Sequence, residues 1–349
     1  MNLRLIQNAD VENKKVLLRI DFNVAIKNGR AQELFKIKSC KESLEYLLDK
    51  NAKIALVSHF GRPEGKINPD YSLKQLIADA EKILSVKIRF IPDCIGERVK
   101  IGLAELAERK VLLLENVRFY EGEEKNDLKF AKLLSENFDV FVNDAFSVCH
   151  RDQASITGVA KILPSFAGFW LQKEIENLER IRNKPKNPAV AIIGGAKIET
   201  KLPLIHNFEK NYNHVLLGGK IANEAIDQKI NFSRKVILPS DFVDSRMDIG
   251  GETIKIFSTI ISGAKTIIWN GPMGKFEEEK YVVGTKKILD AVISSGAFTL
   301  MGGGESVQLL EENNALDKIS FVSTGGGAML EFLSGNRMPG LETLQSLPK

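Results

Sequence analysis

Two lysines four residues apart give the first indication of chemistry in this chain. Lys197 and Lys201 follow Gly194 and Gly195 in the stretch AVAIIGGAKIETK, residues 189–201. On a helix this spacing places both ammonium groups on one face, close to first-turn N–H groups without a partner inside the helix. Such a helix start can bind phosphate. A tight strand-to-helix connection with two solvated lysines explains the stretch equally well, and its glycine spacing is not that of a Walker A loop.

A second set of candidate residues is mostly cationic and lies in the first half of the chain. Each member follows an apolar run that is typical of a buried strand. Because ligands bind outside the carboxyl ends of the strands in a parallel sheet, these residues would share one edge. A single arginine there is more often a surface ion-pair partner. Several together would repel one another without an anion between them. A ligand with a phosphate and a carboxylate would fit. The set is Asp21, Asn23, His59, Arg62, Arg118 and Arg151.

Glycines follow nearly every apolar run of the second half. They let a backbone approach a ligand closely, and the N–H groups after them can cradle phosphate oxygens. One such turn is ordinary, whereas several on one sheet edge indicate a nucleotide site. No G-x-G-x-x-G follows any run, which disfavours a dinucleotide cofactor and a nicotinamide-dependent oxidoreductase. The turns lie at residues 194–195, 218–219, 271–274, 302–304 and 325–327.

Two series of alternating strands and helices must position these residues. Alternation of this kind predicts a parallel sheet in each half. Helices are predicted at 40–48 and 73–84, and residues 164–182 predict a turn followed by a long amphipathic helix that connects the halves. The predicted strands are 16–20, 52–57, 111–114 and 140–142 in the first half, and 189–193, 214–217, 236–238, 266–269, 298–301 and 321–322 in the second.

Length and composition narrow the class of protein. With 349 residues, 44% of them hydrophobic and 27% charged, the chain is long enough for two globular domains. A net charge of +4 argues against a dedicated nucleic-acid binder and suits an anionic small substrate. The three cysteines show no metal-ligand spacing, which indicates free thiols in a reducing compartment. Neither a signal peptide nor an apolar run of membrane-spanning length is found, so we expect a cytoplasmic protein.

Several motifs in the same order make the chain resemble phosphoglycerate kinase. The resemblance implies two Rossmann-like three-layer α/β domains with mostly parallel sheets, joined by a hinge helix. It implies a 3-phosphoglycerate-binding domain at 1–165, a nucleotide-binding domain at 166–334, and a C-terminal segment, 335–349, that packs back on the first domain. The motifs are LLRIDFNV, SHFGRP, LENVRF, VNDAF, GGAKIETK, IIWNGPMGKFE, MGGGES and VSTGGGAMLEFL.

The resemblance also implies a role for individual residues. Those that would bind 3-phosphoglycerate are Asp21, Phe22, Asn23, Lys36, His59, Phe60, Gly61, Arg62, Arg118 and Arg151. Those that would bind the nucleotide are Gly195, Ala196, Lys197, Lys201, Gly219, Asn270, Glu277, Gly303, Gly304, Glu305 and Ser306, with Glu277 on the ribose hydroxyls. Catalytic roles would fall to Lys36, Lys197, Gly303 and Gly326, and Glu305 would meet the Mg²⁺ of Mg-ATP or Mg-ADP.

The chain departs from the family pattern at several positions. Lys36 stands where the family has an arginine, and a lysine lacks the bidentate fork of a guanidinium. Glu305 replaces an aspartate that meets magnesium in the family. Lys220 replaces the third glycine of a turn, and Ala25 replaces a proline. The segments 226–236 and 242–248, which in the family help to form the adenine pocket, are short here, so the preference for a nucleotide base is open.

The reaction implied by the resemblance is the reversible phosphoryl transfer of glycolysis between 1,3-bisphosphoglycerate and ADP, giving 3-phosphoglycerate and ATP. The acceptor carboxylate is already ionised at pH 7, so the reaction requires no general base. Catalysis would consist of placement and charge neutralisation as two half-sites close on each other. The expected partners are these small molecules, with no nucleic acid or membrane, and the expected state is a monomer. The alternative is a degenerate relative that binds nucleotide or phosphoglycerate with little turnover.

Overall fold

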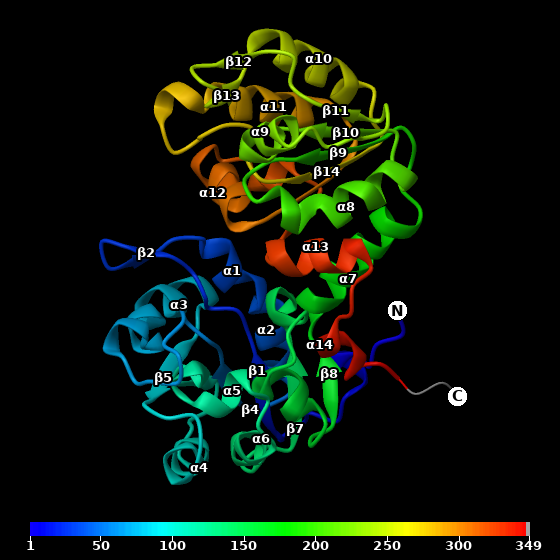
Figure 1. The fold of residues 1–349 in the computed structure, drawn as a ribbon. Helices are drawn as coiled ribbons and strands as arrows, with labels where there is room; N and C mark the ends of the chain where they lie inside the picture. Colours follow the sequence, from blue (N-terminus) through cyan, green and yellow to red (C-terminus); the bar gives the residue numbers. More distant parts are fainter. Residues whose placement is uncertain (347–349) are drawn as a thin grey trace. The chain divides into compact units, whose positions relative to one another are not determined.

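The computed structural model describes residues 1–346 and divides into two compact units (Figure 1). Unit 1 consists of Met1–Ile175 together with the chain from Arg337 on, and unit 2 is Glu176–Asn336. The sequence places the boundary at residue 165, whereas the contacts place it within helix α7 (Phe169–Asn183). Residues 347–349 of the predicted C-terminal segment lie outside the described residues.

Unit 1 is built on a six-stranded parallel sheet with the order β5-β6-β4-β1-β7-β8. Its strands alternate their side chains between two apolar cores, since Val16 and Leu18 belong to one core and Leu17 to the other. Helices therefore cover both faces of the sheet. The strands are β1 (Lys15–Arg19), β4 (Lys53–Val57), β5 (Lys87–Ile91), β6 (Lys110–Leu114), β7 (Val140–Asn143) and β8 (Ser165–Ala167), with a hairpin of β2 (Ile26–Lys27) and β3 (Arg30–Ala31).

The helices of unit 1 divide between the two cores. One core includes Leu44 of α2 and Ala80 of α3, and the other includes Val99 of α4 and Phe130 of α6. The helices are α1 (Leu34–Ser39), α2 (Lys41–Asp49), α3 (Ile77–Leu84), α4 (Glu97–Ala104), α5 (Glu121–Glu124), α6 (Leu128–Ser135) and α14 (Pro339–Glu342). Single turns form at Ile6–Asn8, Pro69–Tyr71, Leu73–Leu76, Val117–Phe119, Phe146–Val148 and Ala154–Gly158.

The sequence prediction missed both edge strands of this sheet. Strand β5 was not predicted because the segment KIRFI places charged residues at alternate positions, as suits an edge that solvent reaches. Residues 165–167 were predicted as part of a turn, but they form β8, which pairs with β7 in the register Phe141↔Ser165. The predicted helix at 73–84 is also divided, into a single 3₁₀ turn and α3.

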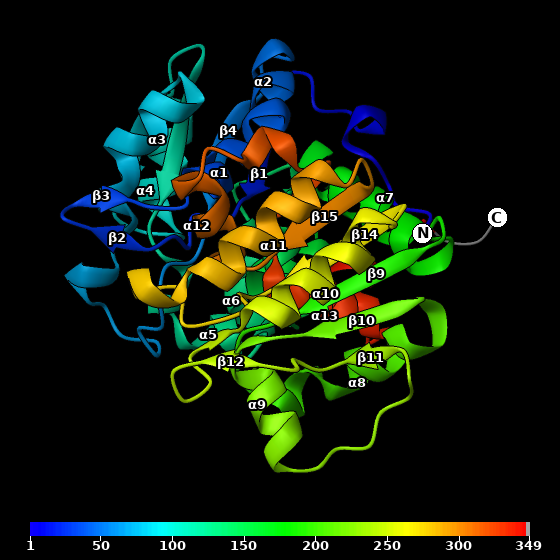
Figure 2. The same ribbon diagram turned by 90° about the horizontal axis from the view of Figure 1, so that it is seen from above.

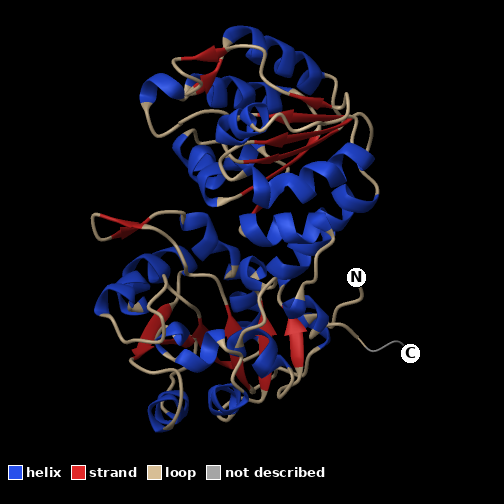
Figure 3. Cartoon of the chain, in the orientation of Figure 1, coloured by secondary structure: helices blue, strands red, loops and turns tan. Residues whose placement is uncertain are grey.

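Unit 2 repeats the scheme with a parallel sheet in the order β11-β10-β9-β14-β15-β16. Helices α10 and α11 cover one face of this sheet, and α8 and α13 cover the other (Figures 1 and 2). Within each sheet the strands lie side by side (Figure 3). The fold class predicted from the sequence, two three-layer α/β domains with parallel sheets, is confirmed.

The strands of unit 2 lie close to their predicted positions, and its helices fill the intervals. The strands are β9 (Ala189–Ile193), β10 (His214–Leu217), β11 (Val236–Ile237), β14 (Thr266–Asn270), β15 (Phe298–Gly302) and β16 (Phe321–Ser323), with a hairpin of β12 (Phe242–Val243) and β13 (Asp248–Ile249). The helices are α8 (Ile198–Asn211), α9 (Gly219–Asp227), α10 (Gly251–Ser262), α11 (Val283–Ser294), α12 (Gly304–Glu312) and α13 (Gly326–Ser334), with single turns at Glu279–Tyr281 and Leu316–Lys318.

The end of the chain packs on unit 1. The N–H of Arg4 donates to the carbonyl of Leu344 at 2.8 Å, and the N–H of Gly340 donates to the carbonyl of Cys149 at 2.9 Å. A Cβ on Gly340 would lie 2.9 Å from the Cα of Cys149, so glycine is required for this close approach. Residues 337–346 are therefore packed into unit 1 rather than forming an appended tail.

The cysteines agree with a further sequence prediction, that of free thiols. Cys40, Cys94 and Cys149 are buried and free of disulfides. Burial raises the pKa of the Cys149 thiol to about 12, so it stays protonated. Among the described residues, no helix combines the length and the apolar character needed to cross a bilayer.

Asp144 provides a prediction about stability, because its carboxyl group is buried at the end of β7. One carboxylate oxygen accepts from the N–H of Leu171 in α7 at 2.9 Å, while the other has no hydrogen-bond partner within residues 1–346. Burial raises the pKa of Asp144 from 3.8 to about 6. Between these values the folded state binds the proton that the unfolded state has lost, so ionisation of this group lowers stability as the pH rises.

We therefore expect Asp144→Asn to stabilise the protein more at pH 8 than at pH 5. The free energy of unfolding of the variant minus that of the parent should be about 1–1.5 kcal/mol larger at pH 8 than at pH 5. Urea denaturation at the two pH values measures it. Asp49→Asn is the control, because Asp49 is exposed on the same unit and its change should stay within about 0.5 kcal/mol at both pH values. An Asp144→Asn effect that is the same at pH 5 and pH 8 would contradict the assignment.

Candidate functional site

Unit 1 gathers the predicted cationic residues at the carboxyl ends of its strands. Loops after β1, β4, β6 and β7 supply them, and α1 adds Lys36. We call this set the cationic half-site. Its members are Asp21, Asn23, Lys36, His59, Arg62, Arg118 and Arg151.

Hydrogen bonds hold three of these loops together. The side-chain oxygen of Asn23 accepts from the N–H of Gly61 at 2.9 Å, and Arg118 Nη1 donates to the Gly61 carbonyl at 2.6 Å. Asp21 accepts from the N–H of Asn23 at 2.9 Å and from Ser147 Oγ at 2.6 Å. These bonds fix the loops after β1, β4 and β6 to one another before any ligand binds, and Ser147 joins them to the loop after β7.

Arg118 is the most informative residue of the cationic half-site. Its side chain is only 3% exposed, and its Nη2 atom has no hydrogen-bond partner among the described residues. Its Nε atom lies 3.4 Å from Glu124 Oε1. Burial, followed by the charge of Arg151, lowers the pKa of Arg118 to about 10. A buried guanidinium with an unused donor is costly, and an anion beside it would remove that cost.

The other cations are close enough to repel one another. Burial and then the charge of Arg62 lower the pKa of Arg151. The structure therefore brings the three predicted arginines into one electrostatic cluster, although Arg62 is exposed and Arg151 is half-buried. Such a cluster favours binding of an anion with more than one negative charge.

Lys36 lies beside the loop that follows β1. Its Nζ atom is 2.8 Å from Glu33 Oε1 and donates to the carbonyl of Asn23 at 3.4 Å. Both side chains of the ion pair are about 13–14% exposed. Glu33 precedes α1 in a left-handed conformation with φ of 47°. The ion pair holds the ammonium group at the cationic half-site.

Three residues predicted to bind substrate also have structural roles. Phe22 is fully buried in the apolar core, and its N–H donates to Ser58 Oγ at 2.9 Å. Phe60 packs in the same core, and both of its backbone polar groups bond to the Asn116 side chain. A Cβ on Gly61 would lie 2.3 Å from the Tyr71 ring. Burial of the aromatic rings and close packing at Gly61 already account for the residue types at these positions. The three residues support the loops of the half-site.

Unit 2 gathers the glycine turns at the carboxyl edge of its own sheet. Helices α8, α9, α12 and α13 each begin within a few residues of a strand end, and none of the four has a side-chain cap. The first-turn N–H groups of such helices are suited to phosphate oxygens. We call this edge the glycine half-site. It comprises Lys197, Lys201, Asn270, Glu305 and Ser306 with the turns 194–195, 218–219, 302–304 and 325–327.

The glycines of this edge are required first by packing between neighbouring loops. A Cβ on Gly194 would lie 2.0 Å from the carbonyl oxygen of Pro272, and one on Gly326 would lie 2.4 Å from the Cα of Gly303. One on Gly219, whose φ is +60°, would lie 2.8 Å from that same Pro272 oxygen. The sequence interpretation attributed these glycines to the approach of a ligand. The structure shows that they also let the loops pack backbone against backbone.

Lys201 connects two strand ends of the glycine half-site. Its Nζ atom donates to the Gly194 carbonyl at 2.7 Å and to Asn270 Oδ1 at 2.9 Å. The side-chain amide of Asn270 extends this series of hydrogen bonds by donating to the Gly302 carbonyl at 2.6 Å. Burial lowers the pKa of Lys201 to about 8, an effect that the nearby Glu305 carboxylate opposes.

Most of the remaining predicted residues of this half-site are more exposed, but Ser306 is buried with 3% exposure. Lys197 precedes α8 with φ of 68°, and Ala196 and Glu277 are also exposed. Partial desolvation, together with the charge of Glu277, raises the pKa of Glu305. Ser306 Oγ accepts from the N–H of Gly271 at 3.1 Å, and Gly304 begins α12. The exposed residues Ala196, Lys197 and Glu277 can reach a ligand. Lys201 and Asn270 instead connect neighbouring strand ends by hydrogen bonds.

Comparison with known proteins identifies the family. A sequence model described as "Phosphoglycerate kinase" matches residues 6–237 and 228–336. A phosphoglycerate kinase from Borrelia garinii subsp. bavariensis is 40% identical, with 95% of this chain and 96% of the relative aligned. Another, from Wolbachia sp. subsp. Drosophila simulans, is 38% identical with 99% of each chain aligned. The chain belongs to the phosphoglycerate kinase family.

Solved structures of phosphoglycerate kinases have the same fold. The crystal structure of the enzyme from Pyrococcus horikoshii OT3 superposes with a TM-score of 0.88 at 29% identity, covering 98% of both chains. The structure of the phosphoglycerate kinase from Coxiella burnetii gives a TM-score of 0.80 at 31% identity, again with 98% coverage of both.

The function predicted from the sequence is confirmed. The protein is a phosphotransferase with a carboxyl group as acceptor, and it acts on small-molecule substrates including a nucleotide. The alternative of a degenerate relative is not favoured, because identity to phosphoglycerate kinases of 38–40% extends along nearly the whole chain.

Sequence reasoning missed three buried polar residues that support the cationic half-site. Arg19 and Glu123 are fully buried, and so is Asn116, which joins the loops after β4 and β6. A signal was present for Arg19, because a charged residue at the end of a strand buried on both faces requires a partner. The partner of such a residue lies far away in the sequence, so only the structure identifies it.

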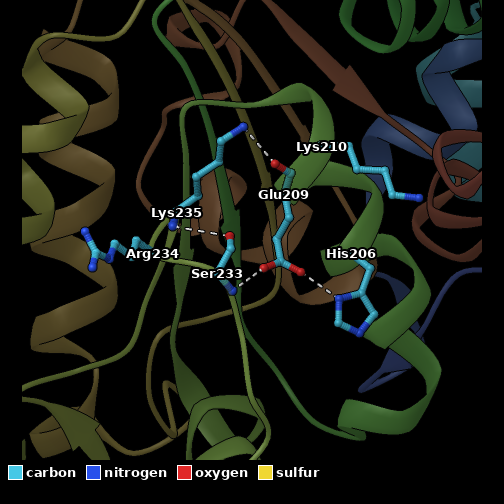
Figure 4. Close-up of a pocket in the computed structure, with 6 residues that line it drawn as sticks. All are labelled: His206, Glu209, Lys210, Ser233, Arg234 and Lys235. Atoms are coloured by element: carbon cyan, nitrogen blue, oxygen red, sulfur yellow. Dashed lines mark hydrogen bonds and ion pairs between the residues drawn. The ribbon is translucent and has the colours of Figure 1, made fainter.

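A surface pocket of about 680 Å³ lies elsewhere on unit 2 (Figure 4). Glu209 organises it, since one carboxylate oxygen accepts from the N–H of Ser233 at 2.7 Å and the other lies 2.6 Å from His206 Nδ1. Lys235 Nζ donates to the Glu209 carbonyl at 2.8 Å. These contacts fasten the loop before β11 to α8, and the pocket contains none of the residues that the motifs of phosphoglycerate kinase single out. Its lining is His206, Glu209, Lys210, Ser233, Arg234 and Lys235.

Proposed function

We propose that the cationic half-site binds 3-phosphoglycerate and that the glycine half-site binds ATP or ADP. The observation that carries the first assignment is the buried guanidinium of Arg118, which has an unused Nη2 donor beside the charge of Arg151. A ligand with a phosphate and a carboxylate would supply the missing acceptors and offset the repulsion. The uncapped helix starts and the lysines of unit 2 support the second assignment.

In the proposed reaction a carboxylate oxygen of 3-phosphoglycerate attacks the γ-phosphorus of ATP. The bond from that phosphorus to the bridging oxygen breaks, and ADP leaves with the electron pair. Lys36 and Lys197 neutralise charge on the equatorial oxygens, while the backbone N–H groups near Gly303 and Gly326 donate to them. The two half-sites must come together for the transfer and exclude water, which would otherwise hydrolyse the acyl phosphate.

We propose further that magnesium enters with the nucleotide. Glu305 offers one carboxylate at the start of α12, and no group of three or more His, Cys, Asp or Glu side chains suited to a metal occurs in residues 1–346. A single carboxylate fits Mg²⁺, which is commonly held by one or two carboxylates together with phosphate oxygens and water. When bound, the ion would offset the phosphate charge.

A coupled assay on the purified chain tests the proposed reaction. We expect ADP formation from ATP that depends on 3-phosphoglycerate at millimolar concentrations. Binding of both substrates without turnover would instead support a degenerate protein. Parallel assays with ATP and GTP would measure the base preference that the short segments 226–236 and 242–248 leave open. We also propose a cytoplasmic monomer without nucleic-acid or membrane partners, and light scattering after size exclusion tests the oligomeric state.

Arg62→Ala is expected to raise the KM for 3-phosphoglycerate about tenfold or more, while kcat changes much less. The reason is that Arg62 is exposed at the rim and would contact the anion without being needed for the fold. Arg98→Ala is the control, since Arg98 is exposed on α4 and outside the cationic half-site. An unchanged KM in the Arg62 variant would remove that residue from the anion site.

A further inference from the structure

A buried network behind the cationic half-site involves Arg19, Ser155 and Glu123. Arg19 is the last residue of β1 and is fully buried, as is Glu123 in α5. Arg19 Nε donates to Ser155 Oγ at 3.1 Å, and that hydroxyl donates to Glu123 Oε1 at 2.6 Å. The second carboxylate oxygen of Glu123 accepts from the Ser155 N–H at 2.8 Å. The network fixes the guanidinium in one orientation and balances its charge.

The far end of this guanidinium faces a histidine of the half-site. Arg19 Nη2 lies 3.2 Å from His59 Nδ1, and both side chains are at most 3% exposed. A guanidinium has only donors and stays protonated, so Nδ1 must be the acceptor and must carry no proton. In a neutral imidazole the proton is then on Nε2. The contact with Arg19 therefore selects one of the two tautomers.

The other nitrogen of His59 is available for a ligand. Nε2 has no hydrogen-bond partner among the described residues, although His59 is only 3% exposed. Burial lowers the pKa of His59 well below its ordinary value, and the positive charges around the ring lower it further. These charges belong to Arg19, Arg118, Arg151 and Lys36. A second ring proton would face a guanidinium hydrogen at Nδ1, so geometry and charge both oppose the imidazolium form.

We propose that Arg19 is a positioning residue that holds His59 as the neutral Nε2–H tautomer, so that His59 gives the half-site an uncharged, directional hydrogen-bond donor. This inference rests on the proposed function, since the acceptor would be an oxygen of 3-phosphoglycerate. The arginines supply the charge that attracts the anion, and His59 supplies a donor that does not change with pH across the neutral range. Arg19 does not contact the substrate in this assignment.

The ligand-free protein provides the first test. The chain contains four histidines, so ¹⁵N NMR of the labelled protein resolves few ring signals, and the signal lost in His59→Gln assigns His59. We expect the Nδ1 shift of an unprotonated ring nitrogen and the Nε2 shift of a protonated one, unchanged from pH 6 to pH 8. A protonated Nδ1, or a titration within that range, would overturn the proposal whatever the activity of the enzyme.

Variants then separate positioning from a merely structural role. Arg19→Met should allow His59 to sample the other tautomer or to titrate, and should raise the KM for 3-phosphoglycerate about tenfold with kcat within about threefold. Arg19→Lys retains a donor and should recover part of the loss. Ser155→Ala removes the hydroxyl that links Arg19 to Glu123 but leaves Arg19 itself in place, so its effects on the His59 spectrum and on KM should have the same direction as those of Arg19→Met and be smaller. If Arg19→Met does not fold, Arg19→Met/Glu123→Gln removes both buried charges and carries the same expectation.

The outcomes distinguish this proposal from the proposed function. An unchanged His59 spectrum and KM in an Arg19 variant that folds would defeat the positioning role while leaving phosphoglycerate binding intact. Failure of the parent protein to bind 3-phosphoglycerate would defeat the assignment of the half-site, and the tautomer measured in the free protein would still stand.

Discussion

Lys36→Ala is expected to lower kcat about 100-fold or more while changing the KM for 3-phosphoglycerate only a few-fold. In the proposed mechanism the ammonium group offsets charge that develops on the transferring phosphoryl group, which matters more in the transition state than in the bound substrate. The structure supports this placement, because Glu33 and the carbonyl of Asn23 hold Lys36 beside the loop after β1. Steady-state kinetics with both substrates varied would measure the two constants.

Lys38→Ala is the matched control for this experiment. Lys38 lies two residues further along α1, is exposed, and carries the same charge, so its loss should leave kcat within about twofold. Lys36→Arg restores the family residue and tests whether the bidentate fork raises kcat above that of the parent. Equal turnover in Lys36→Ala and in the parent protein would remove Lys36 from the mechanism.

Gly326→Ala is expected to destabilise unit 2 and to lower turnover. A Cβ at this position would lie 2.4 Å from the Cα and 3.0 Å from the nitrogen of Gly303, and both are backbone atoms that cannot turn aside. The loops after β15 and β16 would have to separate. We expect a loss of about 1–3 kcal/mol in the free energy of unfolding, with kcat lowered about 100-fold as the N–H donors move.

The next residue provides the control for that substitution. Gly327 lies in the same first turn of α13, and a Cβ there would meet no atom within 4 Å. Gly327→Ala should therefore fold normally, and it should be stabilised by up to about 1 kcal/mol because alanine loses less conformational entropy in a helix. Chemical denaturation and the coupled assay on both variants would measure the contrast. Equal behaviour of the two variants would show that the close approach of Gly326 to Gly303 has no consequence.

The motifs alone predicted much of the candidate site, since strand ends are encoded locally. An apolar run such as residues 189–193 defines a strand buried on both faces, and whatever follows it stands at the ligand-binding edge of a parallel sheet. The same pattern predicts Arg118 and Lys201 as site residues. The resemblance also implied Phe22 and Phe60, whose side chains pack in the core, and a motif does not distinguish a ligand contact from the packing beneath it.

The sequence by itself determined the two parallel sheets, the position of nearly every inner strand and the family, because apolar periodicity and turn residues act over a few neighbouring positions. Only the tertiary structure decided which distant groups meet. Arg19 and His59 are 40 residues apart and become partners because β1 and β4 are neighbours in the sheet. The tautomer proposed for His59 depends on that pairing of strands, and the packing of Gly326 against Gly303 depends on the pairing of β15 with β16. No local sequence pattern encodes either pairing.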